Sequence, residues 1–218
     1  MQLFVFVILI LGAMGSSFAQ TTPDLGPEAD VPSVDDLDTL IPEVDADQPA
    51  VVDTDGPPEA SELDALFVRL KDAEGTSEAD RIAREIQLLW LDSGSDTVDL
   101  MMARAGQALK AEDHALALDM LDIVVTLSPD FAEGWNRRAT VFYMQRDFAR
   151  SLVDIERTLA LEPRHWGAMS GLAIIQRRLG QEDRALVTFK KAVEIHPGLT
   201  SALETIEALE KEAAGEPI

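Results

Sequence analysis

The sequence predicts an all-α protein made of antiparallel helix pairs stacked in a row. Pro129, Pro163 and Pro197 lie 34 residues apart, and each follows an apolar run. Segments aligned at this offset repeat small or apolar residues at steps of four and three, which is the spacing of one helix face. Each unit contains two such runs. A period of this length with two helices per unit is typical of a stacked repeat array.

Small or apolar residues recur at fixed positions in both helices of each unit. In the second helices the aligned sets are Ala117, Leu121 and Val124; Ser151, Ile155 and Thr158; and Ala185, Phe189 and Ala192. In the first helices they are Met101, Trp135 and Met169, and Ala105, Ala139 and Ala173. A small side chain where two helices cross lets their backbones approach, and proline ends the second helix.

These residues resemble the tetratricopeptide repeat (TPR) family, whose motif is W-x2-L-G-x2-Y, A-x3-F and P at a 34-residue period. The resemblance covers residue 98 to about residue 199. The second unit departs from the motif, with Arg138 where leucine is usual and Ser151 where alanine is usual. The third unit matches best, through Leu172, Gly180, Ala185, Phe189 and Pro197.

The resemblance implies a right-handed superhelical stack whose first helices line a concave groove that binds another protein. It places the three repeats at residues 98–131, 132–165 and 166–199. The chain also resembles a group of short exported TPR proteins of Gram-negative bacteria, in which runs like residues 133–140 and 161–165 recur. That likeness spans roughly residues 63–197. It implies a periplasmic setting and brings no established activity.

Helices are also expected on both sides of the three repeats. A capping box beginning at Ser61 opens a helix pair over residues 61–97. A shift of 34 residues aligns Ala83 with Ala117, so we interpret this pair as a degenerate repeat. Residues 200–214 are rich in glutamate on one side and are expected to form a C-terminal capping helix.

The N-terminus has the pattern of a signal peptide over residues 1–19. Its apolar run is too short for a comfortable membrane span, and small residues before Ala19 mark a cleavage site. Cleavage would leave an exported, periplasmic protein without a membrane attachment. No lysine or arginine precedes the apolar run, so an uncleaved N-terminal anchor is the alternative. The absence of cysteine excludes a lipoprotein anchor and any disulfide framework.

Residues 20–60 are predicted to be a disordered, acidic, proline-rich linker. They hold 12 acidic residues, seven prolines and no lysine or arginine. Their apolar residues are scattered rather than periodic. Such a segment buries too little surface to offset the entropy lost on ordering.

The net charge of −22 is unevenly distributed. Residues 137–191, the basic segment, contain 11 basic and six acidic residues, while the rest of the chain is strongly acidic. The acidic linker folding over the basic segment, an acidic partner docking there, and a merely solvated surface are three alternatives. Nucleic acid is not an expected partner, because the overall field repels phosphate.

The sequence predicts neither an enzyme nor a bound cofactor. It lacks the Gly-rich phosphate loop, the nucleophile elbow and the H-E-x-x-H metal motif. His114, His165 and His196 are dispersed, and there is no cysteine, so a metal site is not expected either.

The predicted binding surface is formed by the first helices of the second and third repeats. In the second repeat Asn136, Thr140 and Tyr143 share a helix face, and Ser170, Ile174 and Arg177 are the equivalent positions in the third. The predicted partner-binding residues are Asn136, Arg137, Thr140, Tyr143, Arg164, His165, Ser170 and Arg177.

The arginines allow two interpretations. Arg137, Arg164 and Arg177 resemble the arrangement of the carboxylate-clamp TPR domains, which implies an acidic segment or a C-terminal carboxylate as partner. Alternatively, these arginines bridge neighbouring acidic helices and Trp166 belongs to the core.

Two functional hypotheses follow. The first is an exported adaptor that holds a peptide or segment of a partner protein in its concave groove. The second is a structural or assembly protein that self-associates through the ends or the convex face of the array.

Overall fold

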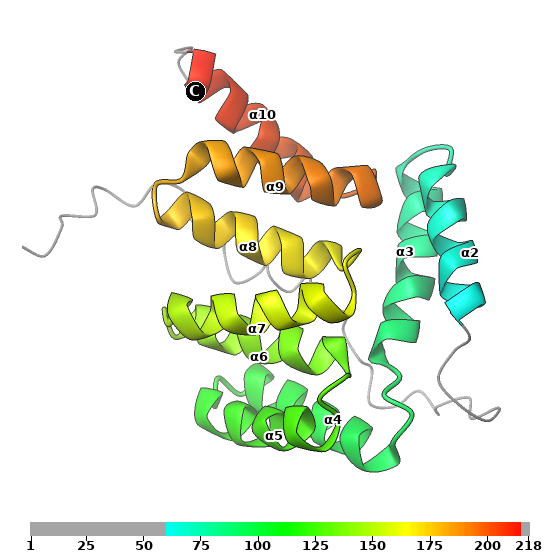
Figure 1. The fold of residues 1–218 in the computed structure, drawn as a ribbon, viewed down its shortest axis with the longest axis vertical. Helices are drawn as coiled ribbons and strands as arrows, with labels where there is room; N and C mark the ends of the chain where they lie inside the picture. Colours follow the sequence, from blue (N-terminus) through cyan, green and yellow to red (C-terminus); the bar gives the residue numbers. More distant parts are fainter. Residues whose placement is uncertain (1–59, 215–218) are drawn as a thin grey trace, which may run out of the picture. The chain divides into compact units, whose positions relative to one another are not determined.

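The computed structural model describes residues 60–214, which form nine α-helices and no strand (Figure 1). The predicted signal peptide and all but the last residue of the predicted linker lie outside the described residues. The helices are α2 (Ala60–Lys71), α3 (Thr76–Leu91), α4 (Asp96–Lys110), α5 (His114–Leu127), α6 (Ala132–Met144), α7 (Phe148–Leu161), α8 (Trp166–Arg178), α9 (Glu182–Ile195) and α10 (Thr200–Ala214).

The predicted all-α stack of antiparallel helix pairs is confirmed. Helices α4–α5, α6–α7 and α8–α9 form the three pairs, and they follow one another along the stack with α10 packed on α9 (Figure 1). The small residues at the predicted crossings are buried, with Ala105, Ala139 and Ala173 at most 2% exposed. Ala117 and Ala185 are fully buried in the second helices of their pairs.

The turn inside each pair is built the same way at 34-residue intervals. Glu112, Arg146 and Gly180 adopt the left-handed backbone conformation, with φ of 56°, 59° and 70°. This conformation reverses the chain after the first helix and suits glycine best. After the first two turns, the side chains of Asp113 and Asp147 accept a backbone N–H and cap the second helix.

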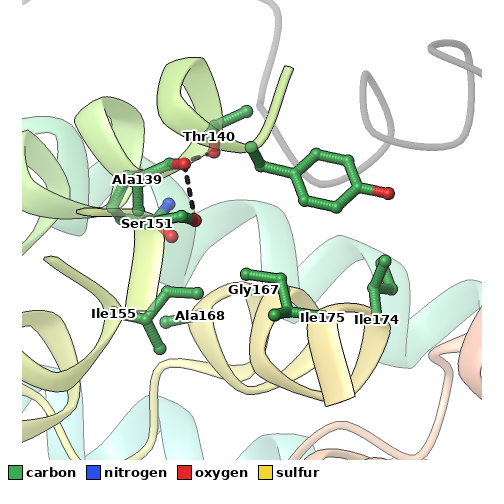
Figure 2. A pocket seen from close by; sticks show the side chains of 11 residues that line it. Ala139, Thr140, Ser151, Ile155, Gly167, Ala168, Ile174 and Ile175 are labelled. Carbon is green, nitrogen blue, oxygen red and sulfur yellow. Dashed lines mark hydrogen bonds between the residues drawn. The ribbon is translucent and has the colours of Figure 1, made fainter. Parts of the chain in front are cut away.

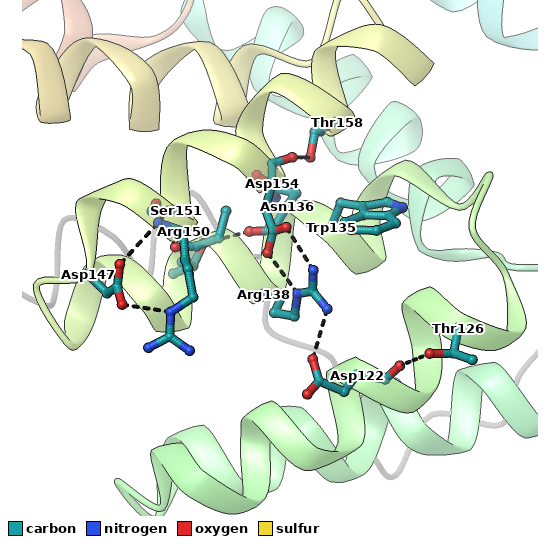
Figure 3. Close-up of polar contacts among 12 residues, drawn as sticks. Asp122, Thr126, Trp135, Asn136, Arg138, Asp147, Arg150, Ser151, Asp154 and Thr158 are labelled. Carbon is teal, nitrogen blue, oxygen red and sulfur yellow. Dashed lines mark hydrogen bonds and ion pairs between the residues drawn. The ribbon is translucent and has the colours of Figure 1, made fainter.

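The two departures from the repeat motif are compensated by neighbouring residues (Figure 3). Arg138 donates from Nε and Nη2 to the two carboxylate oxygens of the buried Asp154, both at 2.8 Å, and from Nη1 to Asp122, also at 2.8 Å. The hydrogen bonds with Asp154 raise the pKa of the Arg138 guanidinium. The hydroxyl of Ser151 donates to the Ala139 carbonyl at 2.8 Å. Arg138 therefore ties α6 to both α5 and α7 in place of an apolar contact.

Helices α2 and α3 form a hairpin that does not continue the stack. Their buried residues, such as Ile82 and Ile86, share one core cluster with Trp166, Phe189 and Leu199 near the other end of the array. Figure 1 shows α3 beside the ends of the stacked helices. The interpretation of this pair as an in-phase repeat therefore needs correction, because its apolar face covers the turns that join successive repeats.

The sequence of α4 explains why α3 does not stack on it. Leu100, 49% exposed, occupies the position of Gly134 in the next repeat, where a Cβ atom would lie only 2.6 Å from Val124 of the preceding helix. Gln107 is exposed where the equivalent Val141 is fully buried. A bulky residue and a polar residue at these positions leave the α4 end of the stack facing solvent.

Candidate functional site

A small pocket lies between α6, α7 and α8 and encloses about 30 Å³ (Figure 2). Sites for small-molecule ligands usually measure roughly 300–1,000 Å³. The pocket therefore fits a small apolar group such as the end of a side chain rather than a cofactor. It is lined by Asn136, Ala139, Thr140, Tyr143, Ser151, Ile155, Gly167, Ala168, Gly171, Ile174 and Ile175.

One polar group at the pocket has no partner within residues 60–214, the hydroxyl of Tyr143. The Tyr143 ring packs against Phe148, with 5.7 Å between the ring centroids. The other hydroxyls are engaged: Thr140 donates to the Asn136 carbonyl at 3.0 Å, and Ser151 donates to Ala139. The pocket is therefore mostly apolar, and the buried Tyr143 hydroxyl in its lining has no hydrogen-bond partner within residues 60–214.

Deeper in the array, Glu133 anchors a buried polar cluster. Its Oε1 accepts from Nε of Arg137 at 3.0 Å, and its Oε2 accepts from Nδ2 of Asn136 at 3.1 Å and contacts Nε2 of His165 at 3.1 Å. All four side chains are at most 7% exposed. Burial raises the pKa of the Glu133 carboxyl, but the hydrogen bond with His165 and the charge of Arg137 outweigh it, so the pKa lies below its usual range.

His165 links this cluster to the N-terminal hairpin. Its Nδ1 accepts the backbone N–H of Ala168 at 3.1 Å, which caps α8 and leaves Nε2 to donate to Glu133. The ring of Trp90, from α3, stacks on the His165 ring at 4.3 Å with an interplanar angle of 9°. The runs 133–140 and 161–165, singled out in the sequence, thus meet at a buried junction rather than on an open groove.

The remaining predicted residues are also engaged within the chain. Ser170 is buried and its hydroxyl donates to the Trp166 carbonyl at 2.9 Å. Arg164 pairs with Glu162 and Asp64, and it covers the Phe67 ring. For these side chains, the structure shows contacts inside the protein.

The three arginines of the clamp-like arrangement do not point to a shared anion site. Arg137 pairs with Glu133 in the core, Arg164 pairs with carboxylates at the hairpin, and Arg177 lies 3.9 Å from Glu212 of α10. Arg164 and Arg177 contact carboxylates of other helices, as the bridging interpretation expects, whereas Arg137 pairs within its own helix. Trp166 is 2% exposed and belongs to the core.

Of the eight predicted binding residues, the structure brings Asn136, Thr140 and Tyr143 together at the pocket. The prediction omitted Gly167 and Gly171, which complete the pocket from α8. The sequence offers a signal for Gly167. A glycine stands there at a shift of 34 residues from Glu133, and the missing side chain leaves room beside α6. The partner-binding role of the eight residues stays a prediction.

Residues 60–214 contain no helix long and apolar enough to cross a membrane. The same part of the chain brings together no group of three or more side chains suited to holding a metal ion.

Comparison with known proteins identifies the array. A tetratricopeptide repeat family model matches residues 102–156 and 145–200. A TPR repeat-containing protein of Rhizobium etli is 40% identical over 153 residues, which are 70% of this chain and 75% of that relative. The chain belongs to the TPR family. TPR arrays are generally interaction modules that bind other proteins rather than catalysts.

A second similarity is local. Anaphase-promoting complex subunit 3 of Schizosaccharomyces pombe is 24% identical over 85 residues, which are 39% of this chain but only 13% of that protein.

Proposed function

We propose that this TPR protein is an exported adaptor that holds a segment of a partner protein against the pocket between α6 and α8. The observation that carries the proposal is the combination of a narrow apolar pocket with the unpartnered Tyr143 hydroxyl at its edge. An extended segment would place a small apolar side chain in the pocket and a backbone amide or carbonyl against Tyr143.

The partner in this proposal is a protein segment of neutral or mixed character. The arginines expected to attract an acidic segment are already paired with Glu133, Glu162, Asp64 and Glu212. A carboxylate would have to displace these internal partners. Recognition therefore rests on shape and on Tyr143, with Ile174 and Gly171 supplying the apolar side.

Export is part of the proposal and rests on the sequence of residues 1–19. The apolar run followed by small residues at Ala19 fits a cleavable signal. The proposal places the mature protein in the periplasm, with Gln20 as its first residue. Peptide mass analysis of the protein purified from its own cells tests this, since retention of residues 1–19 would favour the uncleaved anchor.

Two substitutions test the pocket. Tyr143→Ala removes the phenol, and Gly171→Leu fills the pocket, where a Cβ atom would already lie 3.5 Å from Ile155. We expect each to reduce recovery of a defined partner from an envelope extract at least tenfold, equivalent to about 1.4 kcal/mol. Circular dichroism should show unchanged helicity.

The matched control is Val153→Ala on the outer face of α7, where the side chain is 63% exposed. This variant should retain the partner. If Tyr143→Ala and Gly171→Leu both retain it as well, the pocket is not the binding site.

Self-association is the second candidate, favoured by the exposed Leu100 on the unstacked end of α4. Sedimentation of the mature chain distinguishes the two functions. A stable oligomer that Leu100→Ser dissociates would support the assembly role.

A further inference from the structure

The outer face of α5 carries a stripe of exposed apolar residues. Leu116, Ile123 and Leu127 are 44%, 39% and 55% exposed. They lie at spacings of seven and four residues, so they share one side of the helix. This side faces away from the core residues Ala117, Leu121 and Val124 of the same helix, which are fully buried.

The stripe is not a requirement of the repeat fold. At the positions equivalent to Leu116, α7 and α9 have Arg150 and Arg184. At those equivalent to Ile123 they have Arg157 and Lys191, all exposed. At the position of Leu127 they have Leu161 and Ile195, so the first repeat differs at two of the three stripe positions, where α7 and α9 carry cations. Exposed apolar residues clustered on one helix face mark interaction surfaces.

Acidic residues border the stripe along one edge. Asp119 and Asp122 lie on the exposed side of α5, and the Asp122 side chain is 62% exposed while it pairs with Arg138. Residues 96–131 hold seven acidic and two basic residues. This charge favours a cationic partner. A second copy of the chain is disfavoured as the occupant, because each copy carries a net charge of −22.

We infer that the outer face of α5 docks an amphipathic helix whose apolar stripe is flanked by lysine and arginine. Leu116, Ile123 and Leu127 receive its apolar side chains, while Asp119 and the net negative charge of residues 96–131 attract its basic ones. This surface is separate from the pocket between α6 and α8 and does not depend on it. The first repeat would then hold one partner helix while the second and third repeats hold a different segment.

A synthetic peptide tests this inference without knowledge of the natural partner. The probe is a labelled helical peptide of about five turns with leucines along one face and lysines beside them. Fluorescence anisotropy with the full mature chain at near-physiological salt should show saturable binding. Leu116→Ser with Ile123→Ser should weaken it at least tenfold, without a change in charge. Either single variant should weaken it about threefold if the double variant folds poorly, which circular dichroism reveals.

The matched control is Val153→Ser with Val187→Ser, two exposed valines on the outer faces of α7 and α9. It should leave the peptide affinity unchanged. A peptide of the same composition with its leucines dispersed should bind at least tenfold more weakly.

Three results would overturn the inference. They are no saturable binding of the lysine peptide, equal loss of binding in the α5 variants and the control variants, and equal binding of a peptide with glutamates in place of the lysines. A dimer in sedimentation that the α5 variants dissociate would assign the stripe to a second copy instead.

Discussion

At the scale of single residues, Glu133 is a buried carboxylate that three neighbouring side chains contact. It is 4% exposed, and its two oxygens contact Arg137, Asn136 and His165. A buried carboxylate is tolerated only when donors surround it. The hydrogen bonds and the Arg137 charge meet this need and keep the Glu133 pKa low despite burial. The cluster holds the start of α6 to the start of α8.

Glu133→Gln should destabilise the protein by about 3 kcal/mol, because it leaves Arg137 buried without a counter-charge. Chemical denaturation at neutral pH measures the change in the free energy of unfolding. Glu156→Gln, at an exposed position of α7, is the control and should change it by less than about 0.5 kcal/mol. A loss below about 1 kcal/mol for Glu133→Gln would show that the cluster is not a stabilising element.

Sequence periodicity correctly groups Asn136, Thr140 and Tyr143 on one face of α6, and these residues meet at the pocket. It does not reveal which residues on a face are covered. Asn136 and Arg137 are buried because His165, from a different turn, and Trp90, from α3, close over this region. Such burial depends on contacts between distant segments, which a helix period does not encode.

At the scale of helices, α5 and α6 approach each other closely at one glycine. Gly134 makes this approach possible, because a Cβ atom there would lie 2.6 Å from Val124 and 3.2 Å from Phe131. Close-packed helices relieve such a clash only by moving apart.

Gly134→Ala should therefore lower the free energy of unfolding by about 1–3 kcal/mol. Gly106→Ala in α4 is the matched control, since its Cβ atom would meet only Nη1 of Arg137 at an ordinary 3.8 Å. This control should be neutral or stabilising by up to about 1 kcal/mol, owing to the higher helix propensity of alanine. Thermal unfolding of both variants measures the difference. Equal effects would contradict the tight α5–α6 contact.

The contact between the N-terminal hairpin and the array should depend on pH through His196. This side chain is 6% exposed and lies 5.0 Å from the Trp166 ring, and neither of its ring nitrogens has a hydrogen-bond partner within residues 60–214. Burial lowers its pKa, and the nearby Asp80 of α3 only partly opposes this. The folded protein thus binds this proton less readily than the unfolded chain.

His196 therefore contributes stability that is present above about pH 6.5 and is lost as the pH falls below that value. We expect His196→Gln to show a shallower loss of stability than the wild type between about pH 7 and pH 5. Urea unfolding at several pH values measures both slopes. Identical slopes would contradict a buried, neutral His196.

The sequence period predicts the three stacked pairs well, because each pair has its own alanines and proline at fixed spacing. It misplaces the hairpin, since Ala83 fits the period while α2 and α3 pack elsewhere. Leu100 and Gln107 are the residues that indicate that no helix pair stacks on α4. A large residue and a polar residue at stacking positions indicate an array end, which alignment of motif positions alone overlooks.

At the scale of the whole molecule, the surfaces of the described array differ in charge. Many cations of the basic segment are paired within the chain, as in Arg138 with Asp154 and Lys190 with Glu210. The pocket between α6 and α8 is largely uncharged, whereas the outer face of α5 is apolar with acidic residues along one edge. Internal pairing therefore occupies part of the basic segment, while cations such as Arg157 and Lys191 stay exposed on the outer faces of α7 and α9.

The most direct test of the central claim is to find where a bound partner contacts the chain. A photo-crosslinking amino acid at Thr140, which lines the pocket while Tyr143 stays intact, compared with one at Val153, reports this position in the producing cells. We expect a defined crosslinked partner from position 140 and none from position 153. A partner crosslinked only from position 153, or equally from both, would contradict binding at the pocket between α6 and α8.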